Sequence, residues 1–191
     1  MLVLGHGGTG KSMLINAITE TFKILGKEHM LAKCATSGVA AIIIGGQTFH
    51  SWAGIPINNP RKENWVELTN HNLRERRKRN IEGKQFLICD EISMCTKQLK
   101  YRGSEIVTRV REAEGIGVAS ECFGGMDVIE FGDFHQFPPV SNPSASLYCD
   151  RPDTDDKHGL QGRSIFMEYD HVVMLREQMR MTDEVWTGIL S

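Results

Sequence analysis

Short, largely apolar runs along the chain predict strands, and those at 2–4 and 86–89 are expected to be buried. The runs lie at residues 2–4, 29–35, 86–89, 127–131 and 172–175. Between them, three segments predict helices: 11–25 by its helical spacing of apolar residues, 38–44 by an apolar run that stops at two glycines, and 96–114 with Thr96 as N-cap. Strands that alternate with helices indicate an α/β fold with a mostly parallel sheet flanked by helices. Ligands of such sheets bind beyond the carboxyl ends of the strands.

Two segments depart from this alternation. Residues 61–84 carry eight basic and four acidic side chains. Their core, residues 74–79, fits a solvated helix face, a DNA contact or a nuclear-import signal. Residues 141–163 are rich in Ser, Pro, Asp and Gly and predict a long loop. Asp183 is a candidate cap for a last short helix.

Composition narrows the class of protein. The 191 residues suit one domain with a core that needs no disulfides. The net charge of −2 argues against a binder that relies on many phosphate contacts. The amino terminus does not resemble a signal peptide, and no apolar run is long enough for a membrane span. Five cysteines without a C-x-x-C pair favour reduced intracellular thiols over a disulfide framework or zinc site.

A glycine-rich motif follows the first predicted strand and opens the first predicted helix. Residues 5–12 read Gly-His-Gly-Gly-Thr-Gly-Lys-Ser and fit the phosphate-binding pattern G-x-x-x-x-G-K-[ST]. The glycines allow a tight turn whose N–H groups face phosphate oxygens, and the helix adds the positive end of its dipole. Lys11 supplies a charge for the phosphates and Ser12 a hydroxyl for Mg²⁺. The predicted nucleotide-binding residues are Gly5, Gly7, Gly8, Thr9, Gly10, Lys11 and Ser12.

Two later strands end in polar side chains. The strand at 86–89 leads into Asp90, a candidate Mg²⁺ ligand, and Glu91, a candidate general base for an attacking water. The strand at 127–131 leads into Gly-Asp-Phe-His-Gln-Phe-Pro-Pro, where Gln136 could donate to a γ-phosphate oxygen. On spacing alone, each cluster is also compatible with an ordinary polar turn. Their shared edge with the glycine motif favours a catalytic role for Asp90 and Glu91, whereas the cluster around Gln136 leaves both interpretations open.

Taken together, these motifs resemble the first motor domain of the Pif-type and RecD-like DNA helicases of superfamily one. Six blocks carry the resemblance in order, at residues 5–12, 34–54, 90–94, 106–111, 123–139 and 175–180. Three positions depart from the family pattern, namely Cys89, His135 and Met179. The resemblance implies a RecA-like P-loop NTPase fold with ATP and Mg²⁺ as cofactors.

The resemblance also implies site residues and partners. Lys11, Glu91 and Gln136 would be catalytic, and Arg180 would reach the γ-phosphate. Single-stranded DNA would be contacted by Thr36, Ser37, His50 and Trp52, although Trp52 also fits the core and His50 a satisfied polar residue. The implied activity is 5′-to-3′ DNA unwinding in repair, recombination and telomere maintenance. A eukaryotic chain would act in the nucleus or mitochondrion.

Length bears on how much of a motor is present. Residues 1–191 are expected to form one RecA-like domain, the amino-terminal half of a two-domain motor whose second half is absent. A nucleotide- and DNA-binding fragment without unwinding activity is therefore an alternative. A small-molecule P-loop kinase is a weaker one, because such kinases usually lack the blocks at 48–52 and 132–139.

Overall fold

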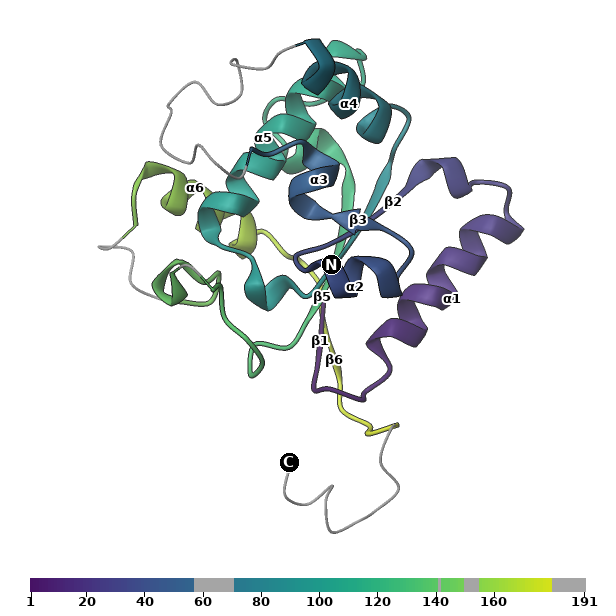
Figure 1. Cartoon of the computed structure of the whole chain (residues 1–191), viewed down its shortest axis with the longest axis vertical. Helices are drawn as coiled ribbons and strands as arrows, with labels where there is room; N and C mark the ends of the chain where they lie inside the picture. Colours follow the sequence, from purple (N-terminus) through teal and green to yellow (C-terminus); the bar gives the residue numbers. More distant parts are fainter. Residues whose placement is uncertain (57–70, 141, 150–154, 180–191) are drawn as a thin grey trace.

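The sheet has the strand order β3-β2-β4-β5-β1-β6, and all of its pairings are parallel. The computed structural model describes residues 1–56, 71–140, 142–149 and 155–179. The strands are β1 (Leu2–Gly5), β2 (Leu31–Ala35), β3 (Gln47–Thr48), β4 (Phe86–Asp90), β5 (Asp127–Gly132) and β6 (Val172–Leu175). Strand β1 lies between β5 and β6, so the start of the chain pairs with two of its later segments (Figure 1).

Helices cover both faces of the sheet. They are α1 (Lys11–Ile24), α2 (Gly38–Ile43), α3 (Phe49–Ala53), α4 (His71–Ile81), α5 (Lys97–Ala113) and α6 (Lys157–Met167). Figure 1 shows α1 on one side of the strands and α5 and α6 on the other. Successive strand residues feed opposite cores, as Leu87 packs with the α3 and α5 side chains while Ile88 packs with α1 and α2. The sheet thus presents one edge, formed by the carboxyl ends of its strands, to the loops.

Most of the predicted helices and strands are confirmed, but the prediction of a long loop at 141–163 is wrong in part. Helix α6 begins inside it, with the Asp156 carboxylate accepting the N–H of Gly159 at 2.7 Å. The polar composition of the segment is typical of a loop, so the helix was not predicted. The glycines of α6 have a packing role. A Cβ on Gly162 would lie 1.8 Å from the Lys97 carbonyl oxygen, so α5 and α6 touch through their backbones. Strand β3 and helix α3 were not predicted, β2 is shorter than expected, and Asp183 lies outside the described residues.

Two lysines on one face of α5 are completely buried in ion pairs. The Lys97 Nζ lies 2.6 Å from an Asp155 carboxylate oxygen, and the Lys100 Nζ lies 2.8 Å from Glu130 Oε1. Lys100 also donates to the Tyr169 hydroxyl at 2.8 Å. These contacts join α5 to β5 and to the segments that flank α6. Because a buried charge without its partner is costly, removing either member of a pair alone is expected to destabilise the fold.

We expect the Lys100→Met variant to lose about 3–5 kcal/mol of unfolding free energy, because Glu130 is left charged and unpaired in the core. Removing both charges, as in Lys100→Met with Glu130→Met, should recover most of that loss. The matched control is Lys78→Met, which breaks an exposed pair with Glu82. Urea unfolding of the three variants and the parent measures the differences, and equal stability of both Lys→Met variants would contradict the ion-pair argument.

Candidate functional site

A hollow of about 420 Å³ lies beyond the carboxyl ends of β1, β4 and β5. It gathers most of the residues that the sequence predicted for nucleotide chemistry. Its lining comprises Gly7, Gly8, Gly10, Lys11, Ser12, Met13, Asp90, Glu91, Gln136 and Met179. Four segments that are remote in the sequence therefore meet around one space of a size that suits a small ligand.

The loop of residues 5–12, called here the phosphate loop, turns tightly into α1. Gly8 and Gly10 have φ values of 91° and 89°, a left-handed conformation that favours glycine. At Gly5 a Cβ would lie 2.4 Å from the Thr9 hydroxyl oxygen, so a side chain would not fit there either. No side chain caps the amino terminus of α1. The N–H groups of its first turn and the helix dipole are thus available to an anion.

Lys11 and Thr9 hold the phosphate loop together in its present form. The Lys11 Nζ donates to the carbonyl oxygens of Gly5 at 2.5 Å and His6 at 3.1 Å. The Thr9 hydroxyl is buried and donates to the same His6 carbonyl at 2.9 Å. Ser12 is exposed on the first turn of α1. The ammonium group of Lys11 therefore lies at the mouth of the loop, where bound phosphates would replace weak neutral acceptors with charged ones.

Asp90 and Glu91 stand at the end of β4, opposite the phosphate loop. Asp90 is buried, and one of its carboxylate oxygens accepts the N–H of Glu91 at 2.8 Å. Burial raises the pKa of Asp90, against the opposing effects of that N–H and of Lys11. Burial also raises the pKa of Glu91, with a further contribution from the Asp90 charge. A carboxylate with a raised pKa is a better proton acceptor, which suits a general base.

The backbone of Glu91 is left-handed, with a φ of 56°. Such a conformation costs a residue with a side chain about 1–3 kcal/mol and persists only where its surroundings impose it. The Thr36 hydroxyl donates to the Glu91 carbonyl oxygen, and the Thr36 N–H donates to the Asp90 carbonyl oxygen at 3.2 Å. These contacts from the end of β2 support the strained residue, whose side chain lines the hollow.

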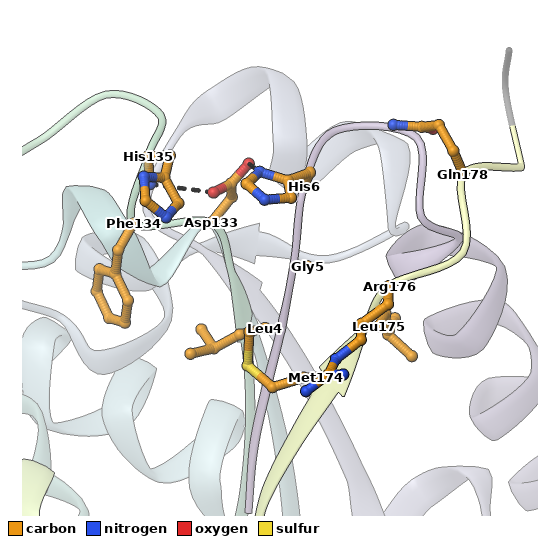
Figure 2. A pocket seen from close by; sticks show the side chains of 10 residues that line it. All are labelled: Leu4, Gly5, His6, Asp133, Phe134, His135, Met174, Leu175, Arg176 and Gln178. Carbon is orange, nitrogen blue, oxygen red and sulfur yellow. Dashed lines mark hydrogen bonds and ion pairs between the residues drawn. The ribbon is translucent and has the colours of Figure 1, made fainter. Parts of the chain in front are cut away.

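Gln136 is held by Asp133, a residue missing from the predicted site. The Gln136 amide nitrogen and the His135 N–H both donate to the Asp133 carboxylate, each at 3.0 Å. Figure 2 shows this carboxylate between His135 and His6 of the phosphate loop, whose Nδ1 lies 3.8 Å from it. Asp133 belongs to the Gly-Asp-x-x-Gln sequence, so the motif itself contained the signal. A polar turn would have the same composition, which is why the sequence alone does not single out this carboxylate.

The four residues predicted to bind DNA differ in their surroundings. Thr36 and Ser37 follow β2 and are partly exposed, with the Ser37 hydroxyl capping α2 through the Ala40 N–H at 3.2 Å. His50 lies on α3, where burial and then the charge of Arg102 lower its pKa. At neutral pH its imidazole is therefore uncharged and suits a neutral hydrogen bond better than an ion pair with phosphate.

Trp52 is a core residue, which corrects the prediction that it contacts DNA. Its exposed fraction is 2%, and it packs against Phe49 with ring centroids 6.1 Å apart. The indole N–H donates to the Asn80 carbonyl oxygen at 3.2 Å. With the side chain covered, no base can stack on it in this conformation. Its burial depends on α4, whose Asn80 lies 28 residues away and cannot be inferred from the local sequence.

We expect Trp52→Ala to lower the free energy of unfolding by about 3–5 kcal/mol, because a large buried side chain is removed. Trp52→Phe should cost less, since it keeps part of the packing and loses one hydrogen bond. Thermal unfolding of both variants, with single-strand binding measured well below their melting temperatures, separates the roles. A stable Trp52→Ala protein with weakened DNA binding would restore the DNA assignment.

The basic run at 74–79 lies on α4, and only part of it is a solvated face. Arg77 is buried and donates to the Gly54 carbonyl oxygen at 2.9 Å, while the Asn80 amide donates to the Trp52 carbonyl oxygen at 2.8 Å. These donors cap the carboxyl end of α3, where carbonyl groups lack partners. Lys78 and Arg79 remain exposed. No helix within the described residues is long and apolar enough to span a membrane.

Comparison with known proteins gives concordant matches. A family model described as PIF1-like helicase matches residues 1–187. The chain is 31% identical over 192 residues to the ATP-dependent DNA helicase Pif1 of Bdellovibrio bacteriovorus, covering 100% of this chain and 38% of that protein. With the ATP-dependent DNA helicase PIF1 of Danio rerio it shares 36% identity over 189 residues, 98% of this chain and 26% of that protein.

Solved structures give the same result for the fold. The crystal structure of Pif1 helicase from Candida albicans has a TM-score of 0.75 at 26% identity and covers 100% of this chain and 39% of its own. That of Bacteroides Pif1 bound to single-stranded DNA has a TM-score of 0.67 at 27% identity, over 100% of this chain and 41% of its own. The RecA-like fold is confirmed, and the chain spans well under half the length of these relatives.

Proposed function

This chain belongs to the PIF1-like helicase family, and from that premise we propose that it forms an ATP-hydrolysing motor domain of a DNA helicase. The observation that carries the proposal is the single hollow shared by the phosphate loop, Asp90, Glu91 and Gln136. Similar proteins support the ligands, since one Bacteroides Pif1 structure is a complex with ADP-AlF3 and single-stranded DNA. In this proposal the nucleotide occupies the hollow and the DNA lies along the same edge of the sheet.

Each site residue has a proposed role. The phosphate loop binds the phosphates through Gly5, Gly7, Gly8, Thr9 and Gly10, and Lys11 neutralises their charge. Glu91 takes a proton from the attacking water, and Gln136 donates to the γ-phosphate from the position that Asp133 gives it. Arg180, which lies outside the described residues, would add positive charge in the transition state. Thr36, Ser37 and His50 remain the proposed DNA contacts.

We also propose a magnesium ion between the phosphate loop and β4. The hydroxyl of Ser12 and the carboxylate of Asp90 both line the hollow, and Asp90 has one oxygen that the Glu91 N–H does not use. Mg²⁺ prefers oxygen ligands and often takes only one or two protein carboxylates beside substrate phosphates. These two residues fit that donor set, and the ion would neutralise developing charge on the phosphates.

ATP hydrolysis by the purified 191-residue chain, measured with and without single-stranded DNA, tests the proposal. A rate that rises with added single strands is expected, because family membership predicts a DNA-coupled motor. A hydrolysis rate that does not change when DNA is added would favour a small-molecule P-loop enzyme. Omitting Mg²⁺, and then restoring it, tests the metal in the same assay.

We propose further that residues 1–191 are one domain of a two-domain motor, since the chain covers only 38% of the Bdellovibrio relative and 26% of the Danio relative. A forked duplex with a 5′ tail separates unwinding from mere binding by this chain. Binding and hydrolysis without strand separation would indicate that the second domain is required. Repair, recombination and telomere maintenance, in the nucleus or mitochondrion of a eukaryote, belong to the same proposal.

A further inference from the structure

The segment that follows β6 lies across the phosphate loop. The Gln178 amide nitrogen donates to the Gly7 carbonyl oxygen at 2.8 Å, and the Met179 N–H donates to the Gly8 carbonyl oxygen at 2.9 Å. Figure 2 shows Gln178 beside the loop that leaves Gly5, above a second hollow of about 450 Å³. Two successive carbonyl groups of the phosphate loop are thus tied to residues 171 positions later in the chain.

These two bonds determine which way the peptide groups of the loop point. In a planar trans peptide, the C=O of one residue and the N–H of the next point in opposite directions. Holding the Gly7 carbonyl therefore turns the Gly8 N–H away from Gln178, and no backbone acceptor among the described residues takes that N–H. A glycine at this position rotates freely when nothing holds it. The Gln178 contact removes that freedom before a phosphate arrives.

Gly7 also touches the predicted sensor. A Cβ built on Gly7 would lie 3.4 Å from the Gln136 amide nitrogen, so the two residues are close neighbours. Gly7 is therefore flanked by two amides, that of Gln136 from the β5 side and that of Gln178 from the β6 side. The Gln178 Oε1 is buried without a partner in the described part of the chain. The single bond to Gly7 thus determines how this amide is oriented.

We propose that Gln178 is a positioning residue that sets the Gly7–Gly8 peptide group for phosphate binding and links the phosphate loop to the segment after β6. The inference rests on the proposed function, because it concerns the same nucleotide site. Gln178 touches no reacting atom and acts through the loop backbone. Its loss should weaken nucleotide binding and raise KM for ATP more than it lowers kcat.

The test compares Gln178→Leu and Gln178→Glu with the parent chain and with Gln161→Leu, an exposed control on α6. The probe is ADP with Mg²⁺, followed by fluorescence or calorimetry. Removing one hydrogen bond should raise the ADP Kd about three- to tenfold in both variants at pH 8. The Gln161→Leu protein should bind like the parent, and the melting temperatures of all four should agree closely.

A pH series distinguishes positioning from a general packing defect. Once protonated, the carboxyl group of the Gln178→Glu variant regains a donor for the Gly7 carbonyl, so its affinity ratio to the parent should move toward one as the pH falls through about 4.3, the ordinary pKa of a glutamate. The ratio for Gln178→Leu should stay constant. Parent-like ADP binding by both variants would overturn the inference while leaving the site intact. If the parent itself failed to bind ADP, the proposed function and the inference would fall together.

Discussion

Lys11→Ala should abolish measurable ATP hydrolysis, with a fall in kcat of about 100-fold or more. The Lys11 ammonium group is the cation at the mouth of the phosphate loop and now donates to two neutral carbonyl groups, at Gly5 and His6. A bound nucleotide would offer charged phosphate oxygens instead, and those charge-assisted bonds strengthen as charge develops during hydrolysis. Steady-state phosphate release in the presence of single-stranded DNA measures the effect.

The matched control for this variant is Lys23→Ala. Lys23 lies on the same helix, is exposed, and makes an i, i+3 pair with Glu20 at 3.4 Å. Its substitution should leave turnover within about twofold, since exposed pairs contribute little. Unchanged hydrolysis in Lys11→Ala would remove the phosphate assignment of residues 5–12.

Glu91→Gln should retain nucleotide binding and lose about 10²–10⁴ in kcat, the usual contribution of a general base. The amide keeps the size and hydrogen-bonding reach of the carboxylate but cannot accept the proton of the attacking water. Glu112→Gln, an exposed position on α5, is the control. Single-turnover hydrolysis and ADP binding are measured on the same samples. Loss of ADP binding in Glu91→Gln would reassign Glu91 to a structural or metal-binding role.

The raised pKa of Glu91 adds a pH dependence to this prediction. The base must be ionised, so kcat should fall on the acidic side at a higher pH than for an ordinary glutamate. The same shift acts on stability with the opposite sense. The folded state favours the neutral acid more than the unfolded chain does. The contribution of the Glu91 carboxyl group to the free energy of unfolding is therefore fully present below the unfolded pKa of about 4.3, and it is lost as the pH rises through the folded pKa. Glu91→Gln should therefore melt higher than the parent near neutral pH, by a margin that shrinks as the solution is acidified.

Buried parallel strands were the most predictable part of the fold. Strands covered on both faces are nearly continuous apolar runs, so β1 and β4 could be predicted directly. Strand β6 is also an apolar run, although most of its residues are exposed. Strand β3 has two residues and leaves no periodic signal. Helix α6 was missed because Gly159 and Gly162 lower the helical signal, although close backbone contact with α5 requires a glycine at 162.

The candidate site was predictable where a motif encodes backbone geometry, and less so where tertiary contacts decide. Residues 5–12 and the acids after β4 follow from local sequence. Whether Trp52 stacks on a base or fills the core depends on Asn80 and the α4 helix, which no local pattern reveals. Asp133 and Gln178 were missed for a related reason. Their importance lies in the side chain or backbone group that each one holds, and those partners are visible only in three dimensions.

The central position of β1 has a consequence for how the protein is made. Its two neighbours, β5 and β6, begin at residues 127 and 172, so a ribosome releases β1 long before either partner exists. Pairing across such sequence separations closes large loops and is slow. The carbonyl groups of the phosphate loop are held by residues 178 and 179, which follow β6. These contacts can form only when β6 has joined the sheet. The nucleotide site is thus expected to take its final form late in folding, after β6 has paired with β1.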